Sequence, residues 1–220
     1  MSERRTPPRG ATAALVLANG TVHWGFGIGV PGVVVGEVCF NTSITGYQEI
    51  LTDPSYAGQI ITFTFPHIGN VGANAEDMEA GQAAARGLVL RAPITQPANW
   101  RSAEHLDNWL RARSLVGISG VDTRSLTRHV RDAGAPGGAI GFFPYSKVNV
   151  EGLHAAAAAW PGLAGMDLAR EVTCNEAHDW RQTRWALDQG YGQTDGTGHH
   201  VVAVDYGAKH NILRCLAILG

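Results

Sequence analysis

The last segment of the chain most constrains its fold. Residues 200–205 read His-Val-Val-Ala-Val-Asp, and after a turn at 206–209 a helical pattern runs from Asn211 to Leu219. A short apolar run of this kind is typical of a strand buried on both faces of a parallel sheet. Such a strand needs further strands beside it and helices on both faces. We therefore expect residues 199–220 to be the truncated start of an open α/β domain.

The preceding part of the chain reads as a mixture of strands and helices. Asn19-Gly20 lies between two apolar runs, 13–17 and 21–24, which is a strong β-hairpin signal. A further helix is expected after Ser102, which we take as its capping residue, and Asp122 leads into another. Strands are expected at 33–40, 60–65, 87–91 and 116–121, and helices at 76–85, 123–132 and 150–159.

These elements suggest a division into domains. A loose tail (1–12) precedes an N-terminal domain (13–150), and a helix with a polar, glycine-rich linker (151–198) leads to the final segment (199–220).

Composition excludes several classes of function. The chain has 17 Lys and Arg against 19 Asp and Glu, so no overall basic field exists to hold nucleic acid or an anionic membrane. No stretch approaches the ~18 apolar residues of a membrane span. Cys39, Cys174 and Cys215 are an odd number without CxxC spacing, which argues against a disulfide framework and a zinc site. We expect a cytoplasmic protein that binds proteins or small molecules.

For two motifs that could bind a ligand, a purely structural role is favoured. Residues 25–29, Gly-Phe-Gly-Ile-Gly, resemble a dinucleotide loop, but they precede a strand and lack the second half of that fingerprint, so a structural turn is favoured. His67, His199 and His200 have no second pair at ligand spacing, so we predict loop histidines and no metal.

A positive strip is expected on the helix at 123–132. Arg124, Arg128 and Arg131 follow at helical spacings of four and three. A solvated face is the favoured interpretation, and a subunit contact is the alternative.

Residues 40–56 are too polar for a core strand. Ser43 lies between Asn41, Thr42 and Thr45, and Gly46 would let a ligand approach the backbone closely. On composition alone, a hydrogen-bonded loop is favoured over a binding site.

Five segments carry a further signal: 41–56, 66–74, 122–128, 161–169 and 204–214. In this order they resemble the small (glutamine-hydrolysing) subunit family of carbamoyl-phosphate synthetase, with similarity from Ala14 to Gly220. The resemblance implies an N-terminal mixed β/α domain of the swivelling β/β/α type, followed by the start of a flavodoxin-like class I glutamine amidotransferase domain.

The resemblance also implies roles. Ser43 matches a serine that contacts the glutamine substrate, whereas the Cys-His-Glu triad that hydrolyses glutamine is expected beyond Gly220. None of the three cysteines lies in the Gly-x-Cys-x-Gly elbow that such a nucleophile needs. We therefore predict no catalytic residue in this chain and no activity of the chain alone.

The implied partner is the large subunit, in a heterodimer. That subunit uses ATP, Mg and bicarbonate to make carbamoyl phosphate for arginine and pyrimidine biosynthesis, and no cofactor is expected in this chain. The alternative is a non-catalytic partner-binding module made as these 220 residues.

Overall fold

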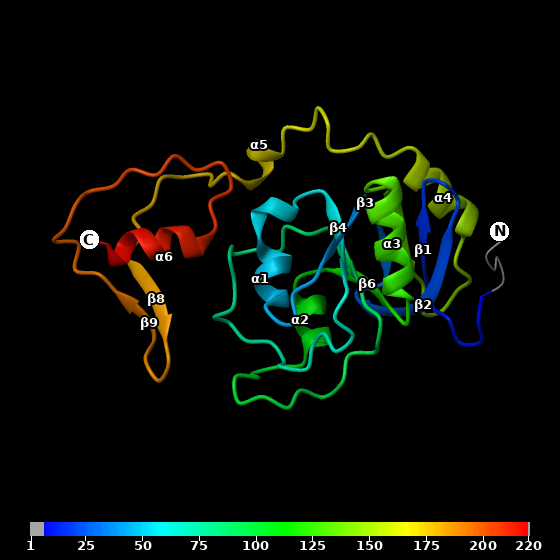
Figure 1. The fold of residues 1–220 in the computed structure, drawn as a ribbon, viewed down its shortest axis with the longest axis horizontal. Helices are drawn as coiled ribbons and strands as arrows, with labels where there is room; N and C mark the ends of the chain where they lie inside the picture. Colours follow the sequence, from blue (N-terminus) through cyan, green and yellow to red (C-terminus); the bar gives the residue numbers. More distant parts are fainter. Residues whose placement is uncertain (1–6, 220) are drawn as a thin grey trace.

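The computed structural model describes residues 7–219, and its main feature is a closed seven-stranded barrel (Figure 1). The strands follow each other around the barrel in the order β1-β2-β6-β5-β4-β3-β7. Their bounds are β1 (Ala13–Leu17), β2 (Val22–Gly29), β3 (Gly32–Asn41), β4 (Gln59–Phe63), β5 (Gly87–Val89), β6 (Val116–Ser119) and β7 (Gly137–Phe142).

The barrel is mixed, and its parallel part sets the position of the loops. β3, β4, β5 and β6 pair in parallel, whereas β1, β2 and β7 make antiparallel pairs. The carboxyl ends of four neighbouring strands therefore meet at one edge.

Helices cover the barrel, and a second unit follows it. The helices are α1 (Tyr47–Thr52), a 3-10 turn η1 (Pro54–Tyr56), α2 (Leu106–Ala112), α3 (Thr123–Ala133), α4 (Val150–Ala158), α5 (Leu168–Val172) and α6 (His210–Ile218). A hairpin of β8 (Gln182–Ala186) and β9 (Gly190–Gln193) packs with α6. This C-terminal unit lies at the opposite end of the molecule from β1 and α4, and the chain between α4 and α5 runs over the barrel (Figure 1).

Side chains along the strands point alternately to the two faces of the sheet, which separates the core into layers. Leu15 and Leu17 pack in one cluster with residues of the other strands and of α3, whereas Ala14 and Val16 pack against α4. On the remaining side, α1 and α2 bury Trp109 against the barrel. A sheet whose residues point alternately to two apolar layers is what a covered barrel requires. The mixed α/β fold class is thus confirmed.

Several predicted elements are present with shifts of a few residues. The β1–β2 hairpin turns at Asn19-Gly20, and Asp122 caps α3 by accepting a hydrogen bond from the Ser125 N–H at 3.2 Å. Of the predicted tail, residues 1–6 lie outside the described part, whereas Thr12 already hydrogen-bonds the barrel through Gly25 and Phe143.

The helix predicted at 76–85 is wrong. The side chain of Asn74 accepts hydrogen bonds from the backbone N–H groups of Glu76 and Asp77, at 2.8 and 3.0 Å. The Glu79 N–H donates to the Thr52 hydroxyl at 2.9 Å. Because side chains satisfy these backbone groups, the segment stays irregular.

Two smaller predictions need correction. Ser102 does not cap α2, since His105 occupies that position and its Nδ1 accepts from the Asp107 N–H at 3.2 Å. Residues 25–29 form no turn but continue β2. A Cβ added at Gly27 would lie 1.9 Å from the ring of Phe142, so close packing explains this glycine.

The C-terminal segment departs most from expectation. The predicted strand at 200–205 is not formed, and Val202 and Val204 are 78% and 73% exposed. Among residues 7–219 no strand pairs with this run, and an unpaired strand leaves its backbone groups unsatisfied. The predicted linker contains the β8–β9 hairpin, whose turn uses Asp188 and Gly190 at positive φ.

Candidate functional site

The Ser43 loop lies at the carboxyl edge of the parallel strands. It follows β3, while residues 64–72 follow β4, and the Thr64 N–H donates to the Asn41 carbonyl at 3.0 Å. At the same edge, Arg91 after β5 pairs with Asp122 after β6 at 3.3 Å. Segments 41–56 and 66–74 therefore begin at the same edge of the barrel as the more distant segment 122–128.

Ser43 is exposed on a braced loop. The Asn41 Oδ1 accepts from the Ser43 backbone N–H at 2.8 Å, and Asn41 Nδ2 donates to the Tyr56 hydroxyl at 2.9 Å. Beside Ser43, Ile44 is 65% exposed. The backbone of the loop is thus held from within, while Ser43 itself is exposed.

The neighbouring polar residues of this segment are buried and structural. Tyr47 donates to the Gly72 carbonyl at 2.5 Å. The Gln48 amide donates to the Asn74 carbonyl at 2.8 Å and accepts from the Asn74 N–H at 3.0 Å. Thr52 bonds the Gln48 carbonyl at 2.8 Å. Helix α1, which follows the Ser43 loop, therefore fixes segment 72–79 against itself.

Glu49 is the titratable group beside this loop. Burial, with smaller contributions from Asp77 and Glu79, raises the pKa of Glu49 to about 7, while Arg101 opposes the rise. Arg101 itself pairs with Asp77 at 2.5 Å. Sequence reasoning missed Glu49, because its charged neighbours come from an irregular segment that was predicted to be a helix.

The three cysteines differ in environment. Burial raises the pKa of Cys39 to about 12, so its thiol stays protonated. Cys174 is exposed, and a hydrogen bond with Asp205 raises its pKa. Cys215 lies in α6, where the Arg184 Nε approaches its Sγ at 3.3 Å. The absence of a catalytic residue from this chain stays a prediction.

The other residues singled out in the sequence lie apart from this loop. The His67 ring packs edge-on against Phe65, with centroids 5.9 Å apart, and His199 and His200 are exposed. In the described part of the chain, no three His, Cys, Asp or Glu side chains are grouped to hold a metal.

The positive strip is present on α3. Arg124, Arg128 and Arg131 are exposed, and Arg131 pairs with Asp132 at 2.8 Å. Both interpretations of the strip, a solvated face and a subunit contact, stay open.

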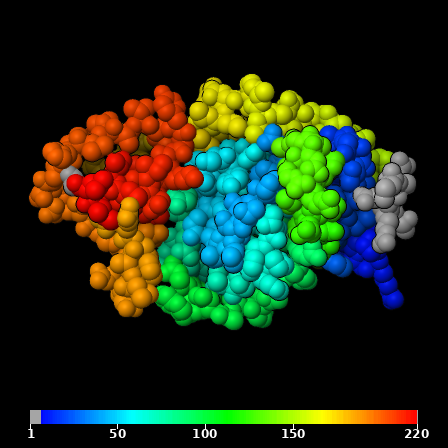
Figure 2. All heavy atoms as spheres, viewed as in Figure 1, coloured from blue at the N-terminus to red at the C-terminus, as the bar shows by residue number. Residues whose placement is uncertain are grey.

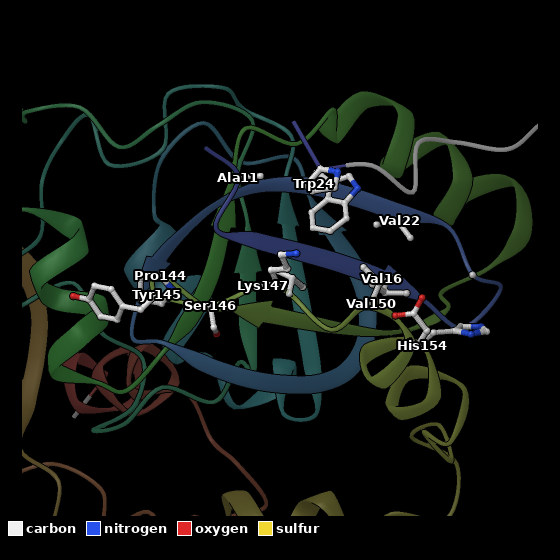
Figure 3. A pocket seen from close by; sticks show the side chains of 14 residues that line it. Ala11, Val16, Val22, Trp24, Pro144, Tyr145, Ser146, Lys147, Val150 and His154 are labelled. Carbon is white, nitrogen blue, oxygen red and sulfur yellow. The ribbon is translucent and has the colours of Figure 1, made fainter. Parts of the chain in front are cut away.

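A separate hollow of about 810 Å³ lies between the β1–β2 hairpin and α4 (Figure 3). Trp24 lies over one side of it, and Lys147 and His154 line the other. His154 is held by the Ala18 carbonyl at 3.1 Å from its Nε2. None of the candidate residues lines this hollow.

No helix among residues 7–219 has the length and apolarity to cross a membrane.

Comparison with known proteins identifies the family. Residues 15–140 match the family described as carbamoyl-phosphate synthase small chain, CPSase domain. The carbamoyl phosphate synthase small chain of Bradyrhizobium diazoefficiens is 55% identical over 218 residues, covering 97% of this chain and 55% of that protein. The small chain of Ruegeria pomeroyi is 54% identical over 209 residues, which cover 95% of this chain and 54% of that protein.

A solved aminopeptidase from Aneurinibacillus sp. strain AM-1 aligns with a TM-score of 0.34 and 15% identity, over 63% of this chain and 32% of that one. A similarity this low supports no inference. The chain spans about half the length of the curated relatives it matches. From its barrel domain and these relatives, the chain belongs to the carbamoyl-phosphate synthase small chain family.

Proposed function

We propose that this chain is the N-terminal part of the small subunit of a glutamine-dependent carbamoyl-phosphate synthase. In the proposed enzyme, the full-length small subunit hydrolyses glutamine and supplies ammonia to a large subunit. The large subunit uses ATP, Mg and bicarbonate to make carbamoyl phosphate for arginine and pyrimidine biosynthesis. Small-chain relatives of about twice this length support the proposal.

The observation that carries the role of Ser43 is its exposure on a braced loop. A hydroxyl can both donate and accept, so it can serve the carboxylate or the amine end of an amino acid. The Asn41 and Tyr56 bonds hold the backbone of the loop before any ligand arrives. Little conformational entropy is then lost on binding, which favours affinity. We assign Ser43 to glutamine binding and to no step of bond cleavage.

The chain alone is expected to be inactive toward glutamine. Covalent hydrolysis of an amide needs an activated thiolate with a base beside it. Cys39 is held as a thiol by burial, and Cys174 has its pKa raised rather than lowered. Cys215 lies within helix α6, not at a strand-to-helix elbow. We therefore place the nucleophile outside residues 1–220. We also propose a reducing, cytoplasmic setting, because all three cysteines are free.

The first experiment is the intact mass of the natural protein. A mass well above 23.4 kDa supports the longer glutaminase subunit. A natural product of 23.4 kDa favours a partner-binding module instead.

The second experiment tests Ser43 in the full-length small subunit assembled with its large subunit. Ser43→Ala is expected to raise KM for glutamine while synthesis from added ammonia is unchanged. Thr42→Ala, an exposed neighbour in the same loop, is the control. Equal loss with both nitrogen donors would contradict the assignment.

A further inference from the structure

An ion pair joins the end of α1 to the start of α6. The Lys209 Nζ lies 2.6 Å from the Asp53 Oδ2, and the side chains are 40% and 10% exposed. Asp53 also accepts from the Ser55 N–H at 2.9 Å, so its carboxylate caps η1 at the same time. The hydrogen bond with Asp53 raises the pKa of Lys209. Removing Lys209 would leave a mostly buried carboxylate without its cation, which is costly.

Glu79 makes a second contact with the start of α6. We call the contacts of Asp53 and Glu79 with residues 209–211 the joint. Its carbonyl accepts from the His210 N–H at 2.9 Å, and its Oε2 accepts from the Asn211 N–H at 2.9 Å. These amides open α6, where Lys209 at the N-cap provides no side-chain hydrogen bond. Two N–H groups of the first turn of α6 are therefore satisfied by a residue from the barrel domain. A carboxylate there also complements the helix dipole.

The turn before α6 is shaped to fit this contact. The Asp205 Oδ1 accepts from the Gly207 and Ala208 N–H groups at 2.8 and 2.6 Å. Gly207 has φ +94°, and a Cβ there would lie 2.5 Å from Val172 and 3.2 Å from Pro54. Only glycine permits both the left-handed backbone and this close approach. The turn thus delivers Lys209 onto Asp53 in a fixed orientation.

The same elements hold the Ser43 loop. Asp53 follows α1 directly, and the Glu79 N–H donates to the Thr52 hydroxyl at 2.9 Å. The other end of α1 follows the Ser43 loop, and six helical residues span only about 9 Å. Figure 2 shows the red C-terminal helix beside the cyan region of the barrel domain, and the Lys209–Asp53 pair joins these two parts of the chain. One short helix therefore separates the joint from Ser43.

We propose that Asp53, Glu79 and Lys209 are positioning residues that set segment 206–219 in place relative to the Ser43 loop. The joint itself is independent of any activity. Its consequence, that the Ser43 loop is held in register with the part of the small subunit that supplies the nucleophile, rests on the proposed function.

The joint is tested by residue-resolved hydrogen exchange in the 220-residue chain. Lys209→Met and Asp53→Asn are each expected to speed exchange of the His210 and Asn211 amides about tenfold, since each breaks a pair whose carboxylate is mostly buried. Asparagine retains an acceptor for the Ser55 N–H, so η1 keeps its cap. The double variant is expected to be no faster than either single one. Lys209→Arg is expected to restore slow exchange.

Arg111→Gln is the matched control for the joint. The Arg111 Nε lies 2.7 Å from the Asp107 Oδ2, which is close to the length of the Lys209–Asp53 pair. The Arg111 and Asp107 side chains are 51% and 23% exposed. It lies within α2, so exchange in α6 should stay within twofold of wild type. The proposed joint would be contradicted if exchange of the His210 and Asn211 amides were unchanged in the Lys209 and Asp53 variants. Additive effects in the double variant would contradict it as well.

The consequence for glutamine is tested in the full-length small subunit with its large subunit. Lys209→Met is expected to raise KM for glutamine severalfold and to leave kcat for ammonia-dependent synthesis unchanged, with Arg111→Gln behaving as wild type. An unchanged KM despite faster exchange would overturn the positioning role. A wild-type subunit without glutaminase activity would refute the proposed function and this role together, while the exchange result would still decide whether the joint exists.

Discussion

Replacing Gln48 by Leu is expected to destabilise the fold, because this side chain satisfies both backbone groups of Asn74. Gln48 is 2% exposed, and its two hydrogen bonds measure 2.8 and 3.0 Å. Leucine has a similar volume but can bond neither the Asn74 N–H nor its carbonyl. Asn74 is part-buried, and each of its backbone groups left unpaired costs about 1–3 kcal/mol, so we expect a loss of about 2–6 kcal/mol. For a chain of this size that corresponds to roughly 4–24 °C in Tm.

Urea unfolding followed by tryptophan fluorescence and far-UV circular dichroism measures this loss, if the two signals coincide. Gln96→Leu makes the same chemical change at an exposed site and should stay within about 0.5 kcal/mol of wild type. A Gln48→Leu loss no larger than that of the control would refute the reasoning. It would mean that water replaces the amide, and that α1 does not hold segment 72–79.

The remaining predictions concern titration and thiol reactivity. Because the pKa of Glu49 is about 7 when folded and near 4.5 otherwise, the folded state binds the proton more tightly, and stability falls as pH rises from about 4.5 to 7. Glu49→Gln should flatten that fall and be more stable at pH 8 by on the order of 1–3 kcal/mol; an unchanged pH profile by chemical denaturation would contradict this. With iodoacetamide at pH 8, Cys174 should be labelled well before Cys39, whose pKa is about 12, and mass mapping in the reverse order would contradict the assigned burial.

Elements with local signals could be predicted from the sequence. The Asn19-Gly20 turn and the Asp122 cap depend on residues within a few positions of each other, and both were confirmed. The irregular course of segment 76–85 depends on Thr52 and Asn74, and no pattern within the segment reveals those partners. The strand at 200–205 failed for a related reason, because its apolar pattern indicates burial that strands elsewhere must provide.

The candidate site was predictable only in part. The polar block at 40–56 indicated a loop, and the resemblance to the small-subunit family singled out Ser43 within it; the structure places Ser43 on an exposed loop. Its part in glutamine binding stays a prediction. The titratable Glu49 and the Asp53–Lys209 pair could not be found, because each depends on contacts between segments that are distant in the sequence.

Closure of the barrel has a consequence for synthesis on the ribosome. β1 pairs with both β2 and β7, and Phe142 lies opposite Ala13 and Gly32. β1 therefore cannot complete its pairing until β7 has been synthesised, and the barrel cannot close until residue 142 has left the exit tunnel. Pairing over such a separation makes folding slow. Nascent chains that end before β7 leave β1 and β3 with open edges, so they are the forms that chaperones would need to shield.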